Sequence, residues 1–452
     1  MVVINEKNRE IYKRMGDQAW YSWGKYRKNS YTITKKVKYG ELWYNTLTRE
    51  IVLVEDKDLD SETPGHKSLV KKWFLVPEDM NDKTMAQFVR QSIYGSVASV
   101  SRKLSFFTIF TTTECTAKCP YCYEYGITKK KMSKETAQKT ADYIIRNAGT
   151  QADLKWFGGE PLMNTEAIDI ICGMVADAGI SIRSDITTNG YYLDKVTDYQ
   201  IVDMWNLKSA QITIDGTEPV HNRIKGLEDA YNKSIKSVNR LSDLGVRVSV
   251  RMHLTENNFD DLSELIKELG RRFSGRKNII MYASPLYEGL GKDYTYMPEN
   301  SKKEFYRKYA EIDQMIHESG VDHGRGVPKI RPFHCMADDR KSIVITPEGK
   351  LTPCEHCADS EFIGDVETGG RIPEKWFEPK EDAKECGTCF FYPQCSRLKM
   401  CEAEYPCGEG YRSYKRHLCE IIMENAYKQY CERRDNHESR KSNRNSGRRK
   451  WV

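Results

Sequence analysis

Three cysteines in the first third of the chain have a spacing suited to holding an iron–sulfur cluster. Cys115, Cys119 and Cys122 are separated by three and then two residues. Three thiolates at this spacing can bind three irons of a four-iron cluster and leave the fourth iron open. A cluster with an open iron can bind a small chelating molecule and act on it, whereas a closed cluster only passes electrons. The alternatives are structural disulfides and a zinc site, which favours four Cys or His ligands in paired knuckles.

A glycine-rich turn follows downstream of the cysteine triplet. The segment Leu154 to Phe157 is predicted as a short buried strand that ends in Gly158, Gly159, Glu160 and Pro161. Two glycines let backbone approach a ligand closely, and the Glu160 carboxylate can accept a hydrogen bond from an ammonium group. Taken alone, this sequence is typical of an ordinary turn. Together, the two motifs resemble the signature of the radical SAM family.

This resemblance implies a cofactor and the residues that hold it. In the family, the open iron binds the amino and carboxylate groups of S-adenosylmethionine (SAM), and the Gly-Gly-Glu-Pro motif holds the methionine amino group. By the same resemblance, Thr187, Thr188 and Asn189 lie near the ribose or the sulfonium, and Arg251 reaches the methionine carboxylate. Arg251 and His253 are equally compatible with satisfied polar groups of a barrel interior.

The middle of the chain alternates between strand-like and helix-like segments. Apolar, β-branched runs predict six strands, at Phe106 to Thr112, Leu154 to Phe157, Ile182 to Thr187, Ala210 to Ile214, Val246 to Leu254 and Ile279 to Ala283. Periodic apolar positions predict helices at Lys134 to Asn147, Thr165 to Ala178, Val196 to Leu207, Leu227 to Leu244 and Phe259 to Phe273. This alternation indicates an α/β fold with a parallel sheet, and the resemblance implies a partial (β/α)6 radical SAM barrel.

The candidate motifs all follow predicted strands at the same end. Cys115 follows the first strand, Gly158 the second, Thr188 the third and Asp215 the fourth. Because ligands of such sheets bind at the carboxyl ends of the strands, we expect these residues to meet in one site. Asp215 is expected either to face the cofactor or to cap the following turn.

Nine of the fourteen cysteines lie between Cys335 and Cys419. Disulfides are one explanation, but we find no signal peptide and no membrane-spanning segment, so a reducing, cytoplasmic location is expected. Zinc is a second explanation. The pattern favours iron, because Cys335 is followed by thirteen residues, Gly349, four residues and Cys354. With the later cysteines, it resembles the SPASM extension, which binds two auxiliary four-iron clusters in radical SAM enzymes acting on peptides and proteins.

The SPASM resemblance implies a set of ligands. The nearer auxiliary cluster takes Cys335, Cys354 and Cys401, and the farther one takes Cys386, Cys389, Cys395 and Cys419. Position 399 is Lys where the family usually has Cys, so that role passes to Cys401 or Cys407. The nearer cluster lacks a fourth ligand unless Cys357 or Cys407 supplies it. If its iron stays open, a substrate cysteine can bind there.

Glu355 is the candidate catalytic residue. It directly follows Cys354 and matches the position where some SPASM enzymes carry an acidic general base. A solvated turn residue is the alternative.

The chain is expected to divide into five parts: an N-terminal α+β module (1–100), the barrel (101–300), a bridging region (301–334), a cysteine-rich SPASM domain (335–431) and a disordered basic tail (432–452). In the module, Glu41 to Val54 is predicted as two strands, followed by helices near Ser68 to Leu75 and Thr84 to Ile93. Many peptide-modifying radical SAM enzymes carry an N-terminal module that grips a leader peptide by strand addition. A plain extension that covers the barrel fits the sequence equally well.

The charge of the chain is concentrated at its end. The net charge is +6, and the last 21 residues carry eight Lys or Arg against three Asp or Glu. The rest of the chain is therefore near neutral, and nothing along it interleaves basic and aromatic residues as nucleic-acid-binding proteins do. No nucleic acid or membrane partner is expected.

The two resemblances imply a radical SAM oxidoreductase with three [4Fe–4S] clusters, one binding SAM and two auxiliary. The favoured function is maturation of a ribosomally made peptide by oxidative crosslinking, through a thioether or a carbon–carbon bond. A precursor peptide and a reducing protein such as flavodoxin or ferredoxin are the expected partners. One alternative is a protein dehydrogenase of the sulfatase-maturing kind, which forms formylglycine. The other is a non-catalytic iron–sulfur electron carrier, which has no need of a methionine site.

Overall fold

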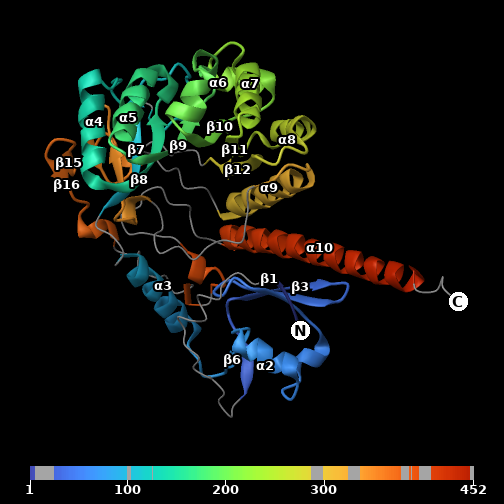
Figure 1. Cartoon of the computed structure of the whole chain (residues 1–452). Helices are drawn as coiled ribbons and strands as arrows, with labels where there is room; N and C mark the ends of the chain where they lie inside the picture. The colour runs from blue at the N-terminus through green and yellow to red at the C-terminus, as the bar shows by residue number, and fades with distance from the viewer. Residues whose placement is uncertain are drawn as a thin grey trace.

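The structure is a computed structural model that describes residues 1–5, 25–98, 103–124, 126–286, 299–323, 336–377, 386–387, 389–395 and 409–447. An α/β body lies at the top of Figure 1, a smaller N-terminal module lies at the bottom, and a long helix near the C-terminus runs between them.

Six parallel strands form the barrel, and each pairs with the next in sequence order. They are β7 (Leu104–Thr112), β8 (Ala148–Gly158), β9 (Ser181–Thr188), β10 (Leu207–Thr213), β11 (Arg247–Leu254) and β12 (Ile279–Pro285). The helices on their outer side are α4 (Lys134–Asn147), α5 (Thr165–Asp177), α6 (Glu218–Lys225), α7 (Ala230–Asp243), α8 (Phe259–Phe273) and α9 (Glu299–Glu318) (Figure 1). The expected α/β fold with a partial (β/α)6 barrel is confirmed.

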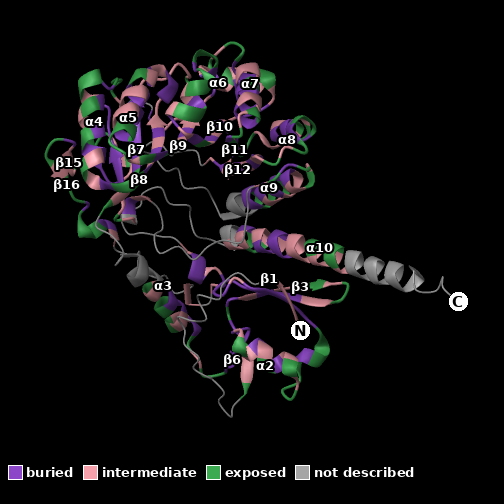
Figure 2. Cartoon of the chain, in the orientation of Figure 1, coloured by how far each residue is buried: buried purple, intermediate pink, exposed green. Residues whose placement is uncertain are grey.

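The barrel forms because its strands and helices share one apolar core. Along β9, buried residues alternate with exposed or partly exposed ones, as a strand with two different faces requires. In α8 the buried residues recur at Leu262, Leu265, Ile266 and Leu269, which gives one apolar face. Figure 2 shows buried positions concentrated on the sheet and on the helix faces that contact it.

One predicted helix of the barrel is wrong. The segment from Val196 to Leu207 forms only a short π-helical turn, Gln200–Met204, instead of a long α-helix. The amide of Trp205 donates to the carbonyl of Gln200 at 2.8 Å, and Asn206 has a φ of 46°, which ends the helix. The wider turn places the fully buried Trp205 so that its indole nitrogen donates to Asp169 at 2.7 Å.

The sixth helix of the barrel falls in the segment that the sequence assigns to a bridging region. Helix α9 packs against β12, where the Tyr309 hydroxyl donates to the Ala283 carbonyl at 2.9 Å. Phe305, Ile312 and Ile316 belong to the barrel core. The barrel boundary at residue 300 is therefore corrected, because these apolar side chains are buried on the sheet.

The C-terminal region extends the barrel sheet. Strand β13 (Ser342–Ile345) pairs in parallel with β7, and β14 (Lys350–Thr352), β15 (Gly364–Asp365) and β16 (Gly369–Gly370) follow as antiparallel neighbours. The result is one ten-stranded sheet. No strand is predicted here from the residues alone, since β13 has only four residues and its partner lies far away in the chain.

The N-terminal module is an α+β unit, as expected. Its four-stranded antiparallel sheet has the order β1 (Val2–Asn5), β5 (Ile51–Val54), β4 (Gly40–Asn45) and β3 (Thr32–Val37). A second pair joins β2 (Tyr26–Lys28) to β6 (Leu75–Pro77), and the helices are α2 (Pro64–Lys71) and α3 (Asp82–Ala98). The two predicted strands are present as β4 and β5 and the two predicted helices as α2 and α3, while β1, β2, β3 and β6 are additions.

Both faces of this small sheet are covered. One face packs on α2 and the segment after it through Trp43, Val52, Val54, Leu69 and Phe74. The other packs on helix α10 (Glu409–Gly447) through Ile33, Leu42, Tyr44, Ile422 and Met423. In the described part of the module, the edges of this sheet are β1 and β3, and strand addition requires such an edge.

The module also holds the cysteine-bearing segment 386–395. The Gln394 side-chain amide donates to the Thr46 carbonyl at 2.7 Å and to the Tyr44 hydroxyl at 3.1 Å. From α3, Gln87 donates to the Tyr392 hydroxyl at 3.2 Å. The N-terminal module thus forms part of the support for the C-terminal cysteines.

The prediction of a disordered tail over 432–452 is wrong in its first part. Helix α10 continues to Gly447, and residues 448–452 lie outside the described residues. The segment has no Pro, and its many Glu, Lys and Arg residues are good helix formers. A high charge, which suggested disorder, is also compatible with a helix.

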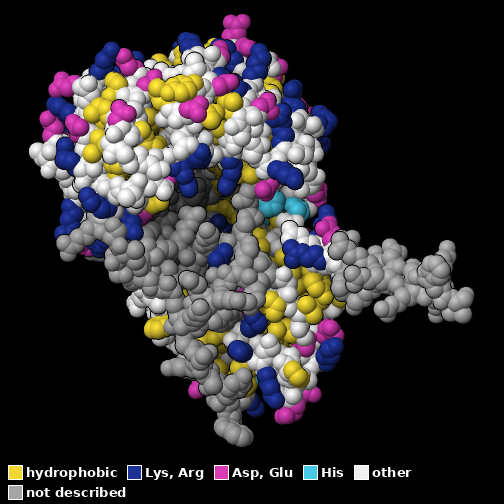
Figure 3. Space-filling model, in the orientation of Figure 1, with side chains coloured by type: hydrophobic (Ala, Val, Ile, Leu, Met, Phe, Trp, Pro, Cys, Tyr) yellow, Lys and Arg dark blue, Asp and Glu magenta, His cyan; other side chains and the backbone are white. Residues whose placement is uncertain are grey.

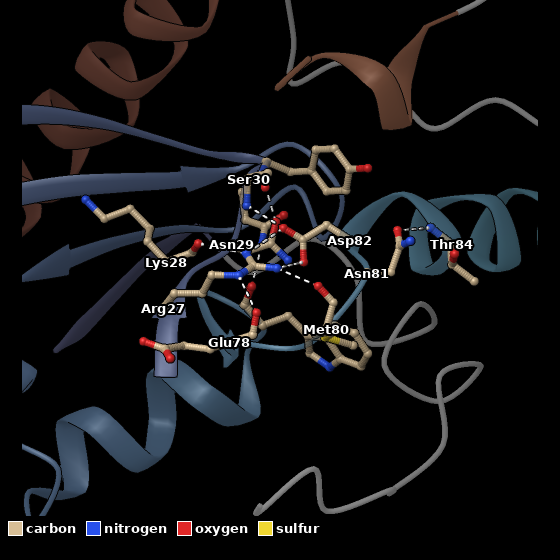
Figure 4. Close-up of polar contacts among 12 residues, drawn as sticks. Arg27, Lys28, Asn29, Ser30, Glu78, Met80, Asn81, Asp82 and Thr84 are labelled. Atoms are coloured by element: carbon tan, nitrogen blue, oxygen red, sulfur yellow. Dashed lines mark hydrogen bonds and ion pairs between the residues drawn. The ribbon is translucent and has the colours of Figure 1, made fainter. Parts of the chain in front are cut away.

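Arg27 and Asp82 fix the start of α3 (Figure 4). The Arg27 guanidinium donates to both Asp82 oxygens, at 2.9 and 3.1 Å, and the Ser30 amide donates to Asp82 at 2.8 Å. Arg27 also donates to the Met80 carbonyl at 2.6 Å. Burial alone would raise the pKa of Asp82, but the hydrogen bonds from Arg27 and Ser30 outweigh it, so this pKa lies below its usual value.

Replacing Asp82 with Asn is expected to lower the free energy of unfolding by about 1–3 kcal/mol at neutral pH, since buried donors lose an ionised acceptor. A carboxyl group with a depressed pKa stabilises the fold above its unfolded pKa of about 3.9, and this stabilisation is lost as pH falls through the folded value. The difference in the free energy of unfolding between the wild type and the variant should therefore be smaller in acid. Urea unfolding at pH 7 and pH 3 measures it, with exposed Asp79→Asn as the control. An equal deficit at both pH values would contradict this account.

Candidate functional site

The three cysteines of the triplet line one cavity of about 340 Å³ at the carboxyl ends of the barrel strands. All three are partly buried free thiols in the segment that follows β7. The volume lies in the range of small-molecule sites. The other predicted residues in its wall are Gly158, Gly159, Thr187, Thr188, Asn189 and Arg251. The structure therefore brings together motifs that come from four different strands.

The two glycines let β8 end directly against the cysteine segment. Gly158 has a φ of 111°, and a Cβ there would lie 2.2 Å from the Thr112 carbonyl oxygen. A Cβ on Gly159 would lie 2.2 Å from the Glu114 carbonyl oxygen. The amide of Gly159 donates to the Thr112 carbonyl at 3.0 Å. A larger residue at either position would push the turn away from the cysteines.

Glu160 lies behind the cavity wall, where it is fully buried. Its carboxylate accepts hydrogen bonds from the Leu162 amide at 3.1 Å, the Thr188 hydroxyl at 2.6 Å and the Asn189 amide at 2.8 Å. Burial raises the pKa of Glu160, and these hydrogen bonds oppose the rise. The carboxylate therefore holds the end of β9 in place. Three of its roughly four acceptor positions are used, so about one remains.

Pro161 is also buried behind the wall and begins the short helical turn Pro161–Asn164. Asn189, which Glu160 holds, directs its side-chain nitrogen to the Cys115 sulfur at 3.9 Å. The turn after β9 therefore contacts the cysteine triplet directly.

Arg251 lines the cavity, and one of its buried donors lacks a hydrogen-bond partner among the described residues. Its Nη2 donates to the Ser284 hydroxyl at 3.2 Å, while its buried Nε has no hydrogen-bond partner among the residues that the structure describes. A buried guanidinium donor without a partner suits an anionic group. This fits the carboxylate of a bound amino acid moiety.

The donor set fits an iron–sulfur cluster better than a single metal ion. Within the described ranges, no three His, Cys, Asp or Glu side chains lie close enough to share one ion. Each thiolate of a four-iron cluster binds a different iron, so its sulfurs are farther apart than those around one ion. Three thiols spread along one cavity wall meet this requirement.

Asp215 neither faces the cavity nor caps a helix. The N-cap of α6 is Thr217, and the Asp215 carboxylate contacts Tyr121, Lys225 and His253 instead. All three of these partners line the cavity, while Asp215 lies behind them. The predicted alternatives for Asp215 are therefore both wrong, because its carboxylate is occupied by buried partners.

The C-terminal region adds Glu355 and His356 to the lining of the cavity. Glu355 lies on the turn Glu355–Cys357 and forms an ion pair with Lys155 of β8, with 2.9 Å between Oε2 and Nζ. The ring of His356 packs against Tyr123, with 4.6 Å between the ring centroids. Glu355 therefore lines the same cavity as the cysteine triplet, and its role as a general base remains a prediction.

The auxiliary cysteines fall into two described groups. Cys354 and Cys357 lie side by side and share a hydrogen bond between their thiols. Cys386, Cys389 and Cys395 lie in the segment that the N-terminal module supports, and buried Cys419 of α10 packs near Phe390 of that segment. Cys335, Cys401 and Cys407 lie outside the described residues. The contact with Cys354 favours Cys357 as the missing ligand of the nearer site.

Several residues of the cavity were not predicted. They are Tyr121, Tyr123, Glu124, Gln211, Lys225 and His356. Glu124 is 3% exposed, and burial raises its pKa to about 7. Tyr121, Tyr123 and Glu124 could have been suspected from their closeness to Cys122 in the sequence. Lys225 gives no such signal, since a lysine in the last turn of a helix usually lies at the surface.

The surface carries mixed charges. Figure 3 shows Lys and Arg side chains interspersed with Asp and Glu over the barrel in this view. In the described part of the chain, no helix has the length and apolar character needed to cross a membrane.

Replacing Glu160 with Gln should destabilise the apo chain by about 1–3 kcal/mol, because the amide group cannot accept all three hydrogen bonds and a buried donor is left without a partner. Urea unfolding measures the change, with exposed Glu166→Gln as the control. Stability equal to the wild type would show that Glu160 does not support the turn after β9.

Comparison with known proteins identifies the central part of the chain. Residues 109–269 match the model of the Radical SAM superfamily. The antilisterial bacteriocin subtilosin biosynthesis protein AlbA of Bacillus subtilis (strain 168) is 25% identical over 336 residues, which cover 71% of this chain and 70% of AlbA. The sporulation killing factor maturation protein SkfB of the same strain is 20% identical over 293 residues, which cover 62% of this chain and 67% of SkfB.

A solved structure with the same fold agrees with this match. The structure described as native anSMEcpe with bound AdoMet superposes with a TM-score of 0.52, at 13% identity, over 72% of this chain and 98% of that chain. At this identity the likeness shows the fold alone. The family match, the cysteine triplet and the cavity at the strand ends agree, and the chain carries a radical SAM domain over residues 109–269.

Proposed function

We propose that this protein is a peptide maturase that uses SAM to crosslink a ribosomally made precursor peptide oxidatively, through a thioether or carbon–carbon bond. The observation that carries the proposal is the shared cavity. Its lining has two parts, a first wall with the thiols of Cys115, Cys119 and Cys122 and a second wall with Glu355, the residue after Cys354. A substrate held between them would contact both the radical site and the auxiliary site.

The residues of the first wall fit a SAM-binding cluster. Cys115, Cys119 and Cys122 would hold the cluster, and the free donor of Arg251 would bind the methionine carboxylate. When bound, the cluster and SAM would supply a 5′-deoxyadenosyl radical that abstracts a hydrogen atom from an unactivated carbon. The task of the chain is then to orient the substrate carbon and to exclude other hydrogen donors.

The second wall supports oxidative chemistry. A crosslink removes two hydrogens from the peptide, one as a hydrogen atom and the other as a proton and an electron. Glu355 would accept the proton, and its ion pair with Lys155 keeps the carboxylate at the cavity. The neighbouring Cys354 and Cys357 would hold the auxiliary cluster that accepts the electron. Atoms and electrons therefore balance without a further oxidant.

The relatives support a peptide substrate. AlbA is named for the biosynthesis of a bacteriocin and SkfB for the maturation of a killing factor. By analogy, a precursor peptide would be the substrate here, and a flavodoxin or ferredoxin in a reducing cytoplasm would supply electrons. A leader peptide could pair with β1 or β3, because both faces of the N-terminal sheet are covered.

Two other functions predict different results. A sulfatase-maturing dehydrogenase would oxidise a single Cys or Ser side chain and form no crosslink. An electron carrier would have no use for a cavity beside its cluster. SAM cleavage distinguishes the carrier from both enzymes, and the product of the peptide reaction distinguishes the two enzymes.

The reconstituted chain, with SAM and dithionite, is expected to form 5′-deoxyadenosine. With the peptide encoded beside its gene, it is expected to give a product lighter by two hydrogens, with a new internal link located by fragment mass spectrometry. Absence of 5′-deoxyadenosine would contradict the enzyme proposal. Conversion of a sulfatase peptide to formylglycine, with no change in the neighbouring peptide, would favour the alternative.

Replacing Glu355 with Gln should slow crosslinking by about 100-fold or more, because the proton acceptor is lost while the shape is kept. Cleavage of SAM should continue, since the first wall is unchanged. Both products are quantified in the same reaction by mass spectrometry. The matched control is Glu367→Gln, an exposed carboxylate of the same region. Crosslinking at the wild-type rate would eliminate Glu355 as the base.

A further inference from the structure

A buried network of four side chains lies directly behind the cysteine loop. Tyr121, which belongs to that loop, donates its hydroxyl hydrogen to the carboxylate of Asp215. Lys225 contacts the same carboxylate with 2.8 Å between Nζ and Oδ2, and His253 with 2.7 Å between Nδ1 and Oδ1. Asp215 is 1%, Lys225 4% and His253 7% exposed. The network therefore joins the cysteine loop to β10, α6 and β11.

The network contains one negative and one positive charge. Burial would raise the pKa of Asp215, but Lys225 and His253 outweigh it and hold this pKa well below its usual range. Burial would lower the pKa of Lys225, but Asp215 outweighs it and raises this pKa. Burial lowers the pKa of His253, and it lowers the pKa of the neighbouring His221 to about 3. Both imidazoles are therefore neutral at pH 7.

The positive end of this pair faces the thiols. Lys225 lines the cavity with the cysteine triplet, whereas Asp215 lies behind it. The Lys225 ammonium also donates to the Tyr121 hydroxyl at 3.2 Å. The carbonyl of Lys225 accepts a hydrogen bond at 2.8 Å from the amide of Lys118, the residue before Cys119. Lys225 thus holds the cysteine loop through its backbone and places a fixed positive charge beside it.

Stability alone does not account for this arrangement. Buried ion pairs can often be replaced by apolar residues of similar volume without loss of stability, because the desolvation of both charges offsets their attraction. A fixed charge beside a cluster has another effect. Reduction adds a negative charge to the cluster, so a nearby cation favours the reduced state, and net charge is one of the factors that set cluster potentials.

We propose that the Asp215–Lys225 pair sets the reduction potential of the cluster held by Cys115, Cys119 and Cys122. Lys225 raises the potential, and Asp215 limits this rise. Both are positioning residues, because they act on the cluster through its surroundings rather than by ligation. The inference rests on the proposed cluster at these three cysteines.

The test is a redox titration of the reconstituted full-length chain without SAM, followed by electron paramagnetic resonance. The signal of this cluster is the one absent from the variant with all three cysteines changed to Ala. Lys225→Met should shift the potential to more negative values and Asp215→Asn to more positive values. At a fixed applied potential, each substitution should change the ratio of oxidised to reduced cluster about tenfold or more. This corresponds to a shift of the reduction potential of about 59 mV for one electron.

The double variant Asp215→Asn/Lys225→Met should have a potential between those of the two single variants and below that of the wild type, because Lys225 lines the cavity and Asp215 lies behind it. Exposed Lys236→Met on α7 is the matched control and should leave the potential unchanged. A merely structural role would not produce shifts of opposite sign. Shifts in the same direction, or no shift, would overturn the inference.

The single variants leave a buried charge unpaired and can fail to load iron. Lys225→Gln keeps a donor toward Asp215 without the charge and should show the same negative shift. A wild-type potential in Lys225→Gln would overturn the inference and leave the proposed function intact. If the wild-type chain has no signal that depends on the three cysteines, both proposals fail.

Discussion

The parallel pairing of β13 with β7 is the constraint on which the rest of the site depends. This pairing makes the C-terminal region part of the barrel sheet, in register from Ser342 opposite Phe106 to Ile345 opposite Ile109. The chain then turns back through β14, and Cys354 and Glu355 follow after Pro353. Because β7 also leads directly into Cys115, one strand pair positions both walls of the cavity. The placement of Cys354 and Glu355 relative to the cysteine triplet is therefore fixed by backbone hydrogen bonds and not by a flexible linker.

The N-terminal module and helix α10 stabilise the more distant cysteines in a different way. Helix α10 packs on the module through one apolar cluster and stacks Tyr414 on Tyr309 of α9, with 4.0 Å between the ring centroids. The segment around Gln394 lies between the module and α10. These contacts are long-range in sequence, so the cysteine segment depends on both ends of the chain. Removal of the module would take away the apolar side chains that pack against Cys386 and Cys389.

The sequence was most informative where a function or a fold depends on local spacing. The cysteine triplet, the Gly-Gly-Glu-Pro turn and the six strands could be predicted because each is defined by a few adjacent residues. Long-range contacts could not be predicted in this way. Lys155 and Glu355 are 200 residues apart in sequence, and Lys225 lies in an ordinary helix terminus. The π-helical turn before Trp205 could not be predicted because it depends on where that side chain is buried. The helix at the end of the chain could not be predicted because charge repulsion and helix propensity oppose each other there.

The central claim is that one cavity lies between a SAM-binding cluster and an auxiliary cluster. The most direct measurement is iron and acid-labile sulfide per chain after anaerobic reconstitution, in the wild type and in the variant with Cys115, Cys119 and Cys122 changed to Ala. The account predicts about twelve irons in the wild type and about eight in the variant, that is, three four-iron clusters reduced to two. A wild-type value near four, or zinc in place of iron at the C-terminal cysteines, would contradict the account.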